Sequence, residues 1–255
     1  MKKTILRRSL LALCLLAAGL GWHFQTYVKQ HVGVLAYHAV NAEPDKYTMD
    51  PAMFEAHVKE LAARGYHGIT LAQAVAAWRG EGDLPPYPVV FTFDDGYRDN
   101  LTVALPILQK YGFTATVFVA TDLMGTRNYL TWDEVRELQR QGVEIGSHTA
   151  SHVALAKLAP DAVRQELTRS QAAIRGQTGQ APLTLAYPFG SRSPEVEAQL
   201  PQAGYLAACT GKAGWNGART NPYQLRRVNM PAPSFGLWEF RVRILRSQLW
   251  GWVGL

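Results

Sequence analysis

Two neighbouring carboxylates are the first residues in this chain whose types and spacing could do chemistry. Asp94 and Asp95 follow the apolar segment 88–93 and precede Gly96. Adjacent carboxylates after a buried strand are costly unless a cation or metal ion balances them. Successive strand side chains point to opposite faces, so both can enter one pocket only where the strand breaks into a turn, which Gly96 permits. A helix N-cap with an acidic neighbour is the alternative.

A second motif, SHTASH at 147–152, follows another apolar segment. His148 and His152 are four residues apart, so on one helical turn they can chelate a single metal ion. Isolated pairs of this kind are also typical of surface or cap histidines. An aspartate from one strand end and two histidines from another, however, make a metal-binding triad with open coordination positions. Together the two motifs favour a metal site.

The elements that must position these residues are repeated strand–helix units. Apolar segments suited to buried parallel strands lie at 33–38, 88–94, 114–120, 143–148, 183–188 and 206–210. Helical patterns lie between them at 52–63, 98–111, 131–142, 161–176 and 194–203. This alternation predicts an α/β fold with a parallel sheet, open or closed into a barrel. In either form the functional residues lie at the carboxyl ends of the strands.

The motifs FTFDDG (91–96), SHTASH (147–152) and AYPFG (186–190) stand in the order typical of one enzyme family. Residues 33–230 resemble the polysaccharide deacetylase family, also called carbohydrate esterase family 4. VLAYHAV (34–40) and FTFDDGYRDN (91–100) look most like its poly-β-1,6-N-acetylglucosamine N-deacetylase branch. The resemblance implies a distorted (β/α) barrel of about seven parallel strands, with residues 31–255 as the catalytic domain.

The resemblance also implies roles for individual residues. Asp95, His148 and His152 would bind a divalent metal ion, most commonly Zn²⁺. Asp94 would be the general base that deprotonates the attacking water. Tyr187 would offer its backbone N–H to the developing oxyanion and line the substrate site.

Three further roles are expected: a general acid, an aromatic wall for the substrate and a partner for the general base. The family's last motif normally supplies a histidine as general acid, but segment 225–230 (LRRVNM) contains none. In the branch with an early Tyr-His, which Tyr37-His38 resembles, the acid comes from the first strand instead, so the resemblance implies His38 as the acid, with a hydrogen-bonded structural histidine as the alternative. Trp215 is expected to form an aromatic wall for the substrate. Either Arg226 or Arg227 is expected to pair with the general base.

These observations predict a metal-dependent hydrolase that removes N-acetyl groups from an N-acetylglucosamine polysaccharide, with poly-β-1,6-N-acetylglucosamine as the specific expectation. The enzymatic alternative is a deacetylase or esterase acting on peptidoglycan, chitin or another acetylated glycan. The alternative from another class is a glycan-binding module that has lost catalysis. A binding module has no need for a base and a complete metal triad, which favours the enzyme.

The charge of the chain lies largely at its N-terminus. The formal net charge is +6, but four basic residues precede an apolar run within residues 1–24, where no acidic residue occurs. This pattern predicts a signal peptide or an N-terminal membrane anchor, and hence export to the periplasm or cell surface. The rest of the chain is nearly neutral, which argues against a nucleic-acid partner. Two cysteines exclude a disulfide-dense scaffold.

The C-terminal segment, about 236–253, predicts an amphipathic helix. Its apolar stripe consists of Trp238, Val242, Leu245, Leu249, Trp252 and Val253. One interpretation is a final helix that packs on the barrel; the other is an interfacial membrane-binding helix or a docking surface for a partner. No obligate protein partner is predicted.

Overall fold

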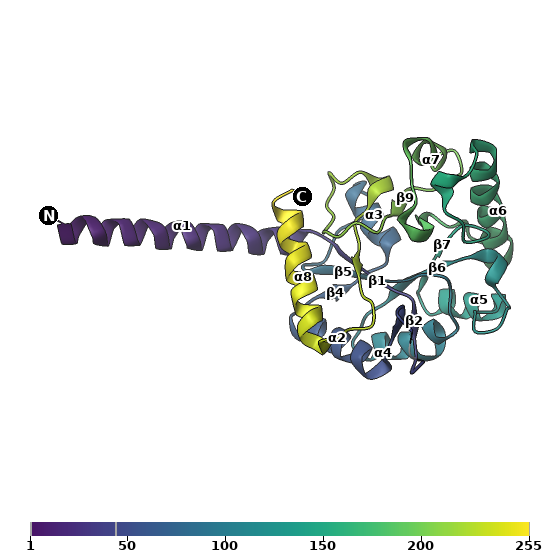
Figure 1. The fold of residues 1–255 in the computed structure, drawn as a ribbon, viewed down its shortest axis with the longest axis horizontal. Helices are drawn as coiled ribbons and strands as arrows, with labels where there is room; N and C mark the ends of the chain where they lie inside the picture. The colour runs from purple at the N-terminus through teal and green to yellow at the C-terminus, as the bar shows by residue number, and fades with distance from the viewer. Residues whose placement is uncertain (1, 44, 255) are drawn as a thin grey trace.

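Parallel strands form the centre of the molecule, in the order β10-β1-β5-β6-β7-β8-β9, with β4 paired to β5 outside that path (Figure 1). The computed structural model describes residues 2–43 and 45–254, with side chains from residue 14 onward. The strands of this sheet are β1 (Gly33–Tyr37), β4 (His67–Gly68), β5 (Pro88–Phe93), β6 (Ala115–Val119), β7 (Glu144–Ser147), β8 (Thr184–Ala186), β9 (Ala207–Cys209) and β10 (Val228–Asn229). This is the curved parallel barrel sheet expected of the deacetylase fold.

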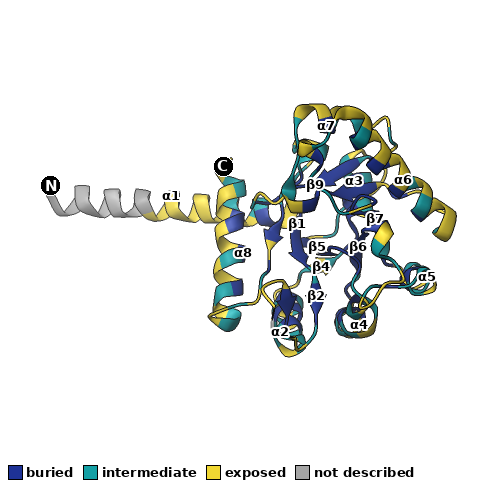
Figure 2. Ribbon diagram, turned by 45° about the vertical axis from the view of Figure 1, so that its right-hand side comes forward, coloured by how far each residue is buried: buried dark blue, intermediate teal, exposed yellow. Residues whose placement is uncertain are grey.

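The strands predicted from apolar segments are confirmed. Every residue of β1, β5 and β6 is buried, which explains why these strands are apolar without alternation. Figure 2 shows the strands dark blue inside a shell of helices whose outer faces are exposed. A separate small pair joins β2 (Ala39–Val40) to β3 (Thr48–Met49) beyond the end of β1.

Segment 225–229 closes the sheet between its two edges. Leu225 forms a parallel bridge with Cys209 at the end of β9, whereas Val228 pairs with Leu35 of β1. The backbone N–H of Arg227 donates to the carbonyl of Lys212 at 2.8 Å. Arg227 therefore lies at the seam where the chain passes from one edge strand to the other.

Helix α1 (Lys2–Gln30) leads into the sheet, and the other helices surround it: α2 (Pro51–Ala63), α3 (Leu71–Trp78), α4 (Leu105–Lys110), α5 (Trp132–Arg140), α6 (Pro160–Thr178), α7 (Pro194–Gln199) and α8 (Gly236–Trp252). Asp50 caps α2 by accepting from Met53 N–H, and Thr131 with Glu134 forms the expected capping box of α5. Helix α3 was not anticipated. The segment predicted as one helix at 98–111 is divided into a π-helical turn at Asn100–Ala104 and α4.

The first and last helices meet at one side of the molecule, where α1 projects away from the body beside α8 (Figures 1 and 2). The Trp252 ring lies edge-on to Phe24 with centroids 5.5 Å apart, and its indole N–H donates to His23 at 2.8 Å. Val28 is buried in the main core. The last turns of α1 therefore belong to the folded body. Within the described part of the chain, no helix combines the length and apolarity that a membrane span needs.

Candidate metal centre and active site

The carboxyl ends of the strands surround a cavity of about 540 Å³. Asp94 and Asp95 reach it directly after β5, and His148 directly after β7. His38, which follows β1, and Tyr187, which follows β8, also line it. The structure thus brings together the residues that the sequence placed at separate strand ends.

Asp95, His148 and His152 form a compact cluster with the geometry of a metal site. One ligand atom from each residue lies within 4.8 Å of the other two. Asp95 Oδ1 lies 3.4 Å from His148 Nε2 and 3.2 Å from His152 Nε2. Oδ1 is buried, and within the described residues it has no hydrogen bond of acceptable geometry. A divalent cation would satisfy this oxygen and both imidazoles, so the donor set fits the expected ion.

The tautomer of His148 suits metal binding. Its Nδ1 lies 2.8 Å from the carbonyl oxygen of Ala186, a contact that requires Nδ1 to carry the proton and leaves Nε2 as the free lone pair. Burial lowers the pKa of His148 and favours the neutral ring that a metal requires. Contact with Asp95, by contrast, raises the pKa of the less buried His152.

Backbone strain accompanies the metal cluster. Asp95 has φ of 73° and His152 has φ of 56°, both in the left-handed region that residues other than glycine seldom adopt. Thr149 (φ 65°) shares this conformation, and its hydroxyl accepts the backbone N–H of His152 at 3.1 Å. Such conformations persist only where surrounding contacts hold them, and they concentrate at functional sites.

A residue that the sequence did not reveal holds the loop between the two histidines. Glu166 of α6 is 8% exposed, and its Oε2 accepts the backbone N–H groups of Ala150 and Ser151 at 3.0 and 2.9 Å. Its Oε1 accepts the Ser151 hydroxyl at 2.7 Å. An acid among the buried residues of α6, beside Val163 and Leu167, is the one sequence feature that could have indicated this role.

Asp94 does not belong to the metal cluster, because Arg227 occupies both of its oxygens. Arg227 Nη1 donates to Oδ1 at 2.7 Å and Nη2 to Oδ2 at 2.9 Å, and both side chains are almost fully buried. Burial alone would raise the pKa of Asp94, but Arg227, with smaller effects of His148 and His38, holds it well below its ordinary value. Asp94 is therefore ionised at neutral pH, and the structure selects Arg227 over Arg226 as its partner.

His38 lines the same cavity as the metal cluster. Its backbone carbonyl accepts Asn100 Nδ2 at 2.9 Å, and its ring centroid is 5.1 Å from that of Tyr47. Its imidazole also contributes to the electrostatic stabilisation of ionised Asp94. His38 is therefore placed where a general acid could meet a bound substrate.

The expected oxyanion role of Tyr187 is wrong in this structure. Its backbone N–H donates to the carbonyl of Cys209 at 3.1 Å, because the chain continues the β8–β9 pairing by one residue. Its phenolic hydroxyl donates to the carbonyl of Tyr223 at 3.0 Å. Tyr187 thus contributes to the cavity wall, but both of its donors are engaged elsewhere.

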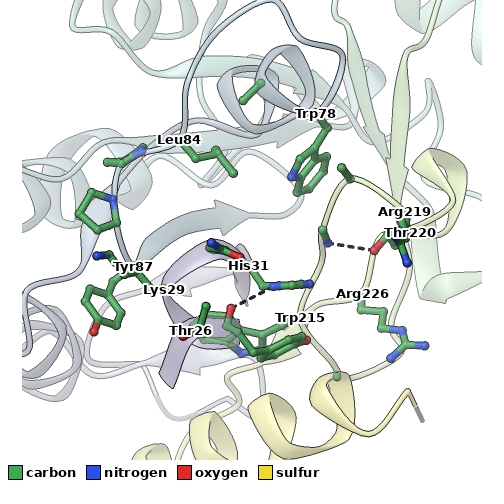
Figure 3. Close-up of a pocket in the computed structure, with 18 of the residues that line it drawn as sticks. Thr26, Lys29, His31, Trp78, Leu84, Tyr87, Trp215, Arg219, Thr220 and Arg226 are labelled. Carbon is green, nitrogen blue, oxygen red and sulfur yellow. Dashed lines mark hydrogen bonds between the residues drawn. The ribbon is translucent and has the colours of Figure 1, made fainter. Parts of the chain in front are cut away.

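The expected position of Trp215 in the substrate wall is also wrong. Trp215 is 3% exposed, its ring packs against Gly33, and its indole N–H donates to Ser247 of α8 at 3.0 Å. It borders a different cavity of about 1530 Å³ at the amino ends of the strands, shared with Trp78, Tyr87 and the last turns of α1 (Figure 3). Trp215 therefore joins α8 to the barrel.

Two other aromatic residues stand at the rim of the catalytic cavity. Phe189 is 76% exposed, and its ring lies edge-on to His152 with centroids 4.8 Å apart. Tyr47 is about half exposed and lies beside His38. Both line the cavity and offer apolar ring surface, Phe189 beside His152 and Tyr47 beside His38.

Comparison with solved structures shows the same fold. A Streptococcus pyogenes deacetylase in complex with acetate is 24% identical, with a TM-score of 0.77 over 86% of this chain and 99% of that one. A polysaccharide deacetylase from Bacillus cereus is 28% identical, with a TM-score of 0.74 over 85% of this chain and 69% of that one.

Sequence comparison points the same way. An Escherichia coli poly-β-1,6-N-acetyl-D-glucosamine N-deacetylase is 35% identical over 105 residues, but the match covers 35% of this chain and 16% of that protein. A Staphylococcus aureus enzyme of the same name is 24% identical over 207 residues, covering 76% of this chain and 71% of that one.

Two further matches include the strands that carry Asp94, Asp95 and His148. The polysaccharide deacetylase family model matches residues 81–208, from the approach to β5 through β9. A Bacillus subtilis protein named as a polysaccharide deacetylase is 30% identical over 197 residues, covering 77% of this chain and 70% of that one. This chain therefore belongs to the polysaccharide deacetylase family of enzymes.

Proposed function

We propose that this polysaccharide deacetylase is a zinc-dependent enzyme that removes N-acetyl groups from poly-β-1,6-N-acetylglucosamine. One observation carries the mechanism: an ionised carboxylate, Asp94, is held by Arg227 beside the separate donor cluster of Asp95, His148 and His152. A carboxylate that ligated the ion could not also accept a proton from the attacking water. The division of work between adjacent aspartates therefore favours hydrolysis.

The chain's own residues have distinct tasks in this proposal. A divalent ion at the triad would supply Lewis acidity toward the amide carbonyl and lower the pKa of a water ligand. Asp94 accepts the proton of the attacking water, and Arg227 keeps it oriented and ionised. His38 donates a proton to the departing amine, since an unprotonated amine is a poor leaving group. Acetate and a free amino sugar are the products, without a covalent enzyme intermediate.

The choice of zinc follows from the donor set. Two imidazole nitrogens and one carboxylate oxygen match catalytic zinc sites, which keep an open position for water or substrate. Other divalent first-row metals accept the same ligands. Metal content by elemental analysis, followed by chelation and reloading with one ion at a time, tests the assignment. Highest activity with an ion other than Zn²⁺ would reject zinc and leave the hydrolase proposal standing.

The proposed glycan rests on the two poly-β-1,6-N-acetylglucosamine deacetylase relatives and on the resemblance of segment 34–40, which contains His38, to that branch. The exposed rings of Phe189 and Tyr47, which line the cavity, could contact the faces of bound sugars. The N-terminal basic and apolar segment supports action outside the cytoplasm, where cell-envelope polysaccharides are found.

Acetate release is the decisive measurement. The metal-loaded enzyme should deacetylate β-1,6-linked N-acetylglucosamine oligomers faster than β-1,4-linked ones, and a chelator should abolish both activities. A preference for chitin oligomers or peptidoglycan would reject the proposed linkage. Asp94→Asn should retain the metal but lose acetate release, whereas full activity in that variant would reject the base assignment.

A further inference from the structure

Helix α8 has two apolar faces, and the barrel covers one of them. Phe240 stacks on His57 of α2 with ring centroids 4.1 Å apart, and Ile244 is buried in the main core. Gln248 donates to the Tyr66 hydroxyl at 2.8 Å, and Ser247 accepts the indole N–H of Trp215. These contacts fix the orientation of α8 on the barrel.

The opposite face carries the stripe that the sequence singled out. Its members recur every three or four residues along α8 and are between 38% and 65% exposed: Trp238, Val242, Leu245, Leu249 and Val253. The final helix does pack on the barrel, as one interpretation expected, but through the opposite face and not through this stripe. Of the stripe residues predicted from the sequence, Trp252 lies elsewhere, against α1. An aligned row of large apolar side chains on the solvent side of a helix indicates an interaction surface.

The position of α1 indicates what covers this stripe. Helix α1 leaves the body beside the C-terminal end of α8, on the same side of the molecule (Figures 1 and 2). Its exposed apolar residues Leu15, Leu16 and Leu20 are 50–65% exposed, and Trp22 is 73% exposed where α1 approaches the body. Any lipid phase that α1 enters would therefore lie next to α8.

Two arginines lie beside the apolar stripe of α8. Arg246 lies over the ring of Trp250, 4.7 Å from its centroid, and Arg241 pairs with Glu60 at 2.8 Å. At 100° per residue, these two arginines flank the stripe on its two sides. Apolar residues on one face with arginines at its edges are typical of helices that lie in an anionic lipid interface, where arginine stems reach the headgroups.

We propose that the exposed stripe of α8 lies flat on an anionic phospholipid bilayer, next to the point where α1 meets that bilayer. Arg243, on the same helix, lines the catalytic cavity. Docking of α8 would therefore hold the cavity close to the membrane surface, where a polysaccharide emerging from the cell first becomes accessible.

A fluorescent label on the stripe tests this contact in the full chain. A Cys14→Ser, Leu245→Cys protein is labelled with an environment-sensitive dye, since the remaining Cys209 is fully buried. It is reconstituted with vesicles of phosphatidylethanolamine and phosphatidylglycerol. We expect a blue-shifted emission that nitroxide groups on the lipid chains quench. The label reports on α8 itself, so attachment through α1 alone would not produce this result.

Matched variants make the outcome specific. A label at Gln165→Cys, on the exposed face of α6, should be neither shifted nor quenched. Adding Leu249→Glu to the Leu245-labelled protein should remove most of the quenching, whereas adding Thr168→Glu on α6 should not. Acetate release from a soluble oligomer should be the same in all of these proteins, which verifies folding.

Three results would overturn the proposal. The first is unchanged, unquenched emission of the Leu245 label on anionic vesicles. The second is equal quenching of the Leu245 and Gln165 labels, which would indicate nonspecific adsorption. The third is a blue shift that depends on protein concentration without vesicles and resists lipid quenchers, because a second copy of the chain would then cover the stripe.

Discussion

Arg227 binds both carboxylate oxygens of Asp94, with Nη1–Oδ1 and Nη2–Oδ2 distances of 2.7 and 2.9 Å. The two residues are 133 positions apart in the sequence and meet because segment 225–229 closes the sheet beside β5 and β1. A planar guanidinium fixes the plane of the carboxylate as well as its charge. The seam of the barrel thus provides the orientation of Asp94, the proposed general base.

Replacing Arg227 by lysine should separate the effect of its positive charge from the effect of its two-point contact with Asp94. Arg227→Lys keeps a cation near Asp94 but loses the two-point contact, so kcat for acetate release should fall about 10- to 100-fold. Arg227→Met leaves a buried carboxylate unpaired and should lower the free energy of unfolding by about 3–5 kcal/mol. Initial rates and urea unfolding measure the two effects.

Arg226→Lys is the matched control, because Arg226 lines the cavity at the opposite end of the strands. Its acetate release should equal that of the wild type. Equal activity in the Arg227→Lys protein would show that the bidentate geometry has no part in catalysis.

Glu166 should govern metal affinity without touching the metal. Its carboxylate accepts two backbone N–H groups and the Ser151 hydroxyl in the loop between His148 and His152, the proposed histidine ligands. Glu166→Gln places an amide donor against these donors, so the loop should loosen and the affinity should weaken about 10- to 100-fold. Titration of the apo protein with Zn²⁺ against a competing chelator measures this change. Gln165→Ala, one residue away and exposed, should leave the affinity unchanged; unchanged affinity in Glu166→Gln as well would limit this carboxylate to a structural role.

The strand-end residues could be predicted because apolar strands and their terminal motifs are local in sequence. Asp94 and Asp95 directly follow β5, His148 directly follows β7, and His152 lies four residues further along; the parallel sheet brings them to one end. The choice between Arg226 and Arg227 depended on how the barrel closes, which no local pattern encodes.

The predictions for Tyr187 and Trp215 were wrong because both residues make tertiary contacts that no local pattern encodes. Tyr187 lies one residue beyond β8, and its N–H donates to Cys209 at the end of β9. The indole N–H of Trp215 donates to Ser247 of α8, a helix that begins 21 residues further along. Helix α8 is apolar on two opposite faces, so the hydrophobic pattern alone could not decide which face meets the barrel. In the structure, the face that contains Phe240 and Ile244 packs into the main core.

His38 is expected to protonate the leaving amine. His38→Gln keeps a polar side chain of similar reach but cannot act as a general acid, so kcat should fall about 100- to 10,000-fold. Bound zinc should remain stoichiometric, because His38 is not among the clustered ligands. Substrates with a better leaving group need less protonation and should suffer a smaller loss. A uniform loss across leaving groups would instead assign His38 to substrate binding.

His57 should make the fold sensitive to acid. It lies on α2 and is buried against α8. Its Nδ1 contacts the Tyr37 hydroxyl at 3.1 Å, and its ring stacks on Phe240. Its Nε2 has no hydrogen-bond partner among the described residues, and burial lowers the pKa of His57 to about 4. Protonation therefore favours the unfolded chain, in which the pKa is near 6.5.

The resulting stabilisation is complete above pH 6.5 and is lost as the pH falls toward 4, by up to about 3 kcal/mol. His57→Gln retains an acceptor for Tyr37 but does not titrate in this range. The difference in unfolding free energy between wild type and His57→Gln should therefore shrink steadily from pH 7 to pH 4, as measured by urea denaturation. Phe240→Leu, which keeps His57, should lower stability at every pH while preserving the acid dependence. Parallel pH profiles for wild type and His57→Gln would mean that other groups cause the acid sensitivity, since subtracting the two profiles cancels every titration except that of His57.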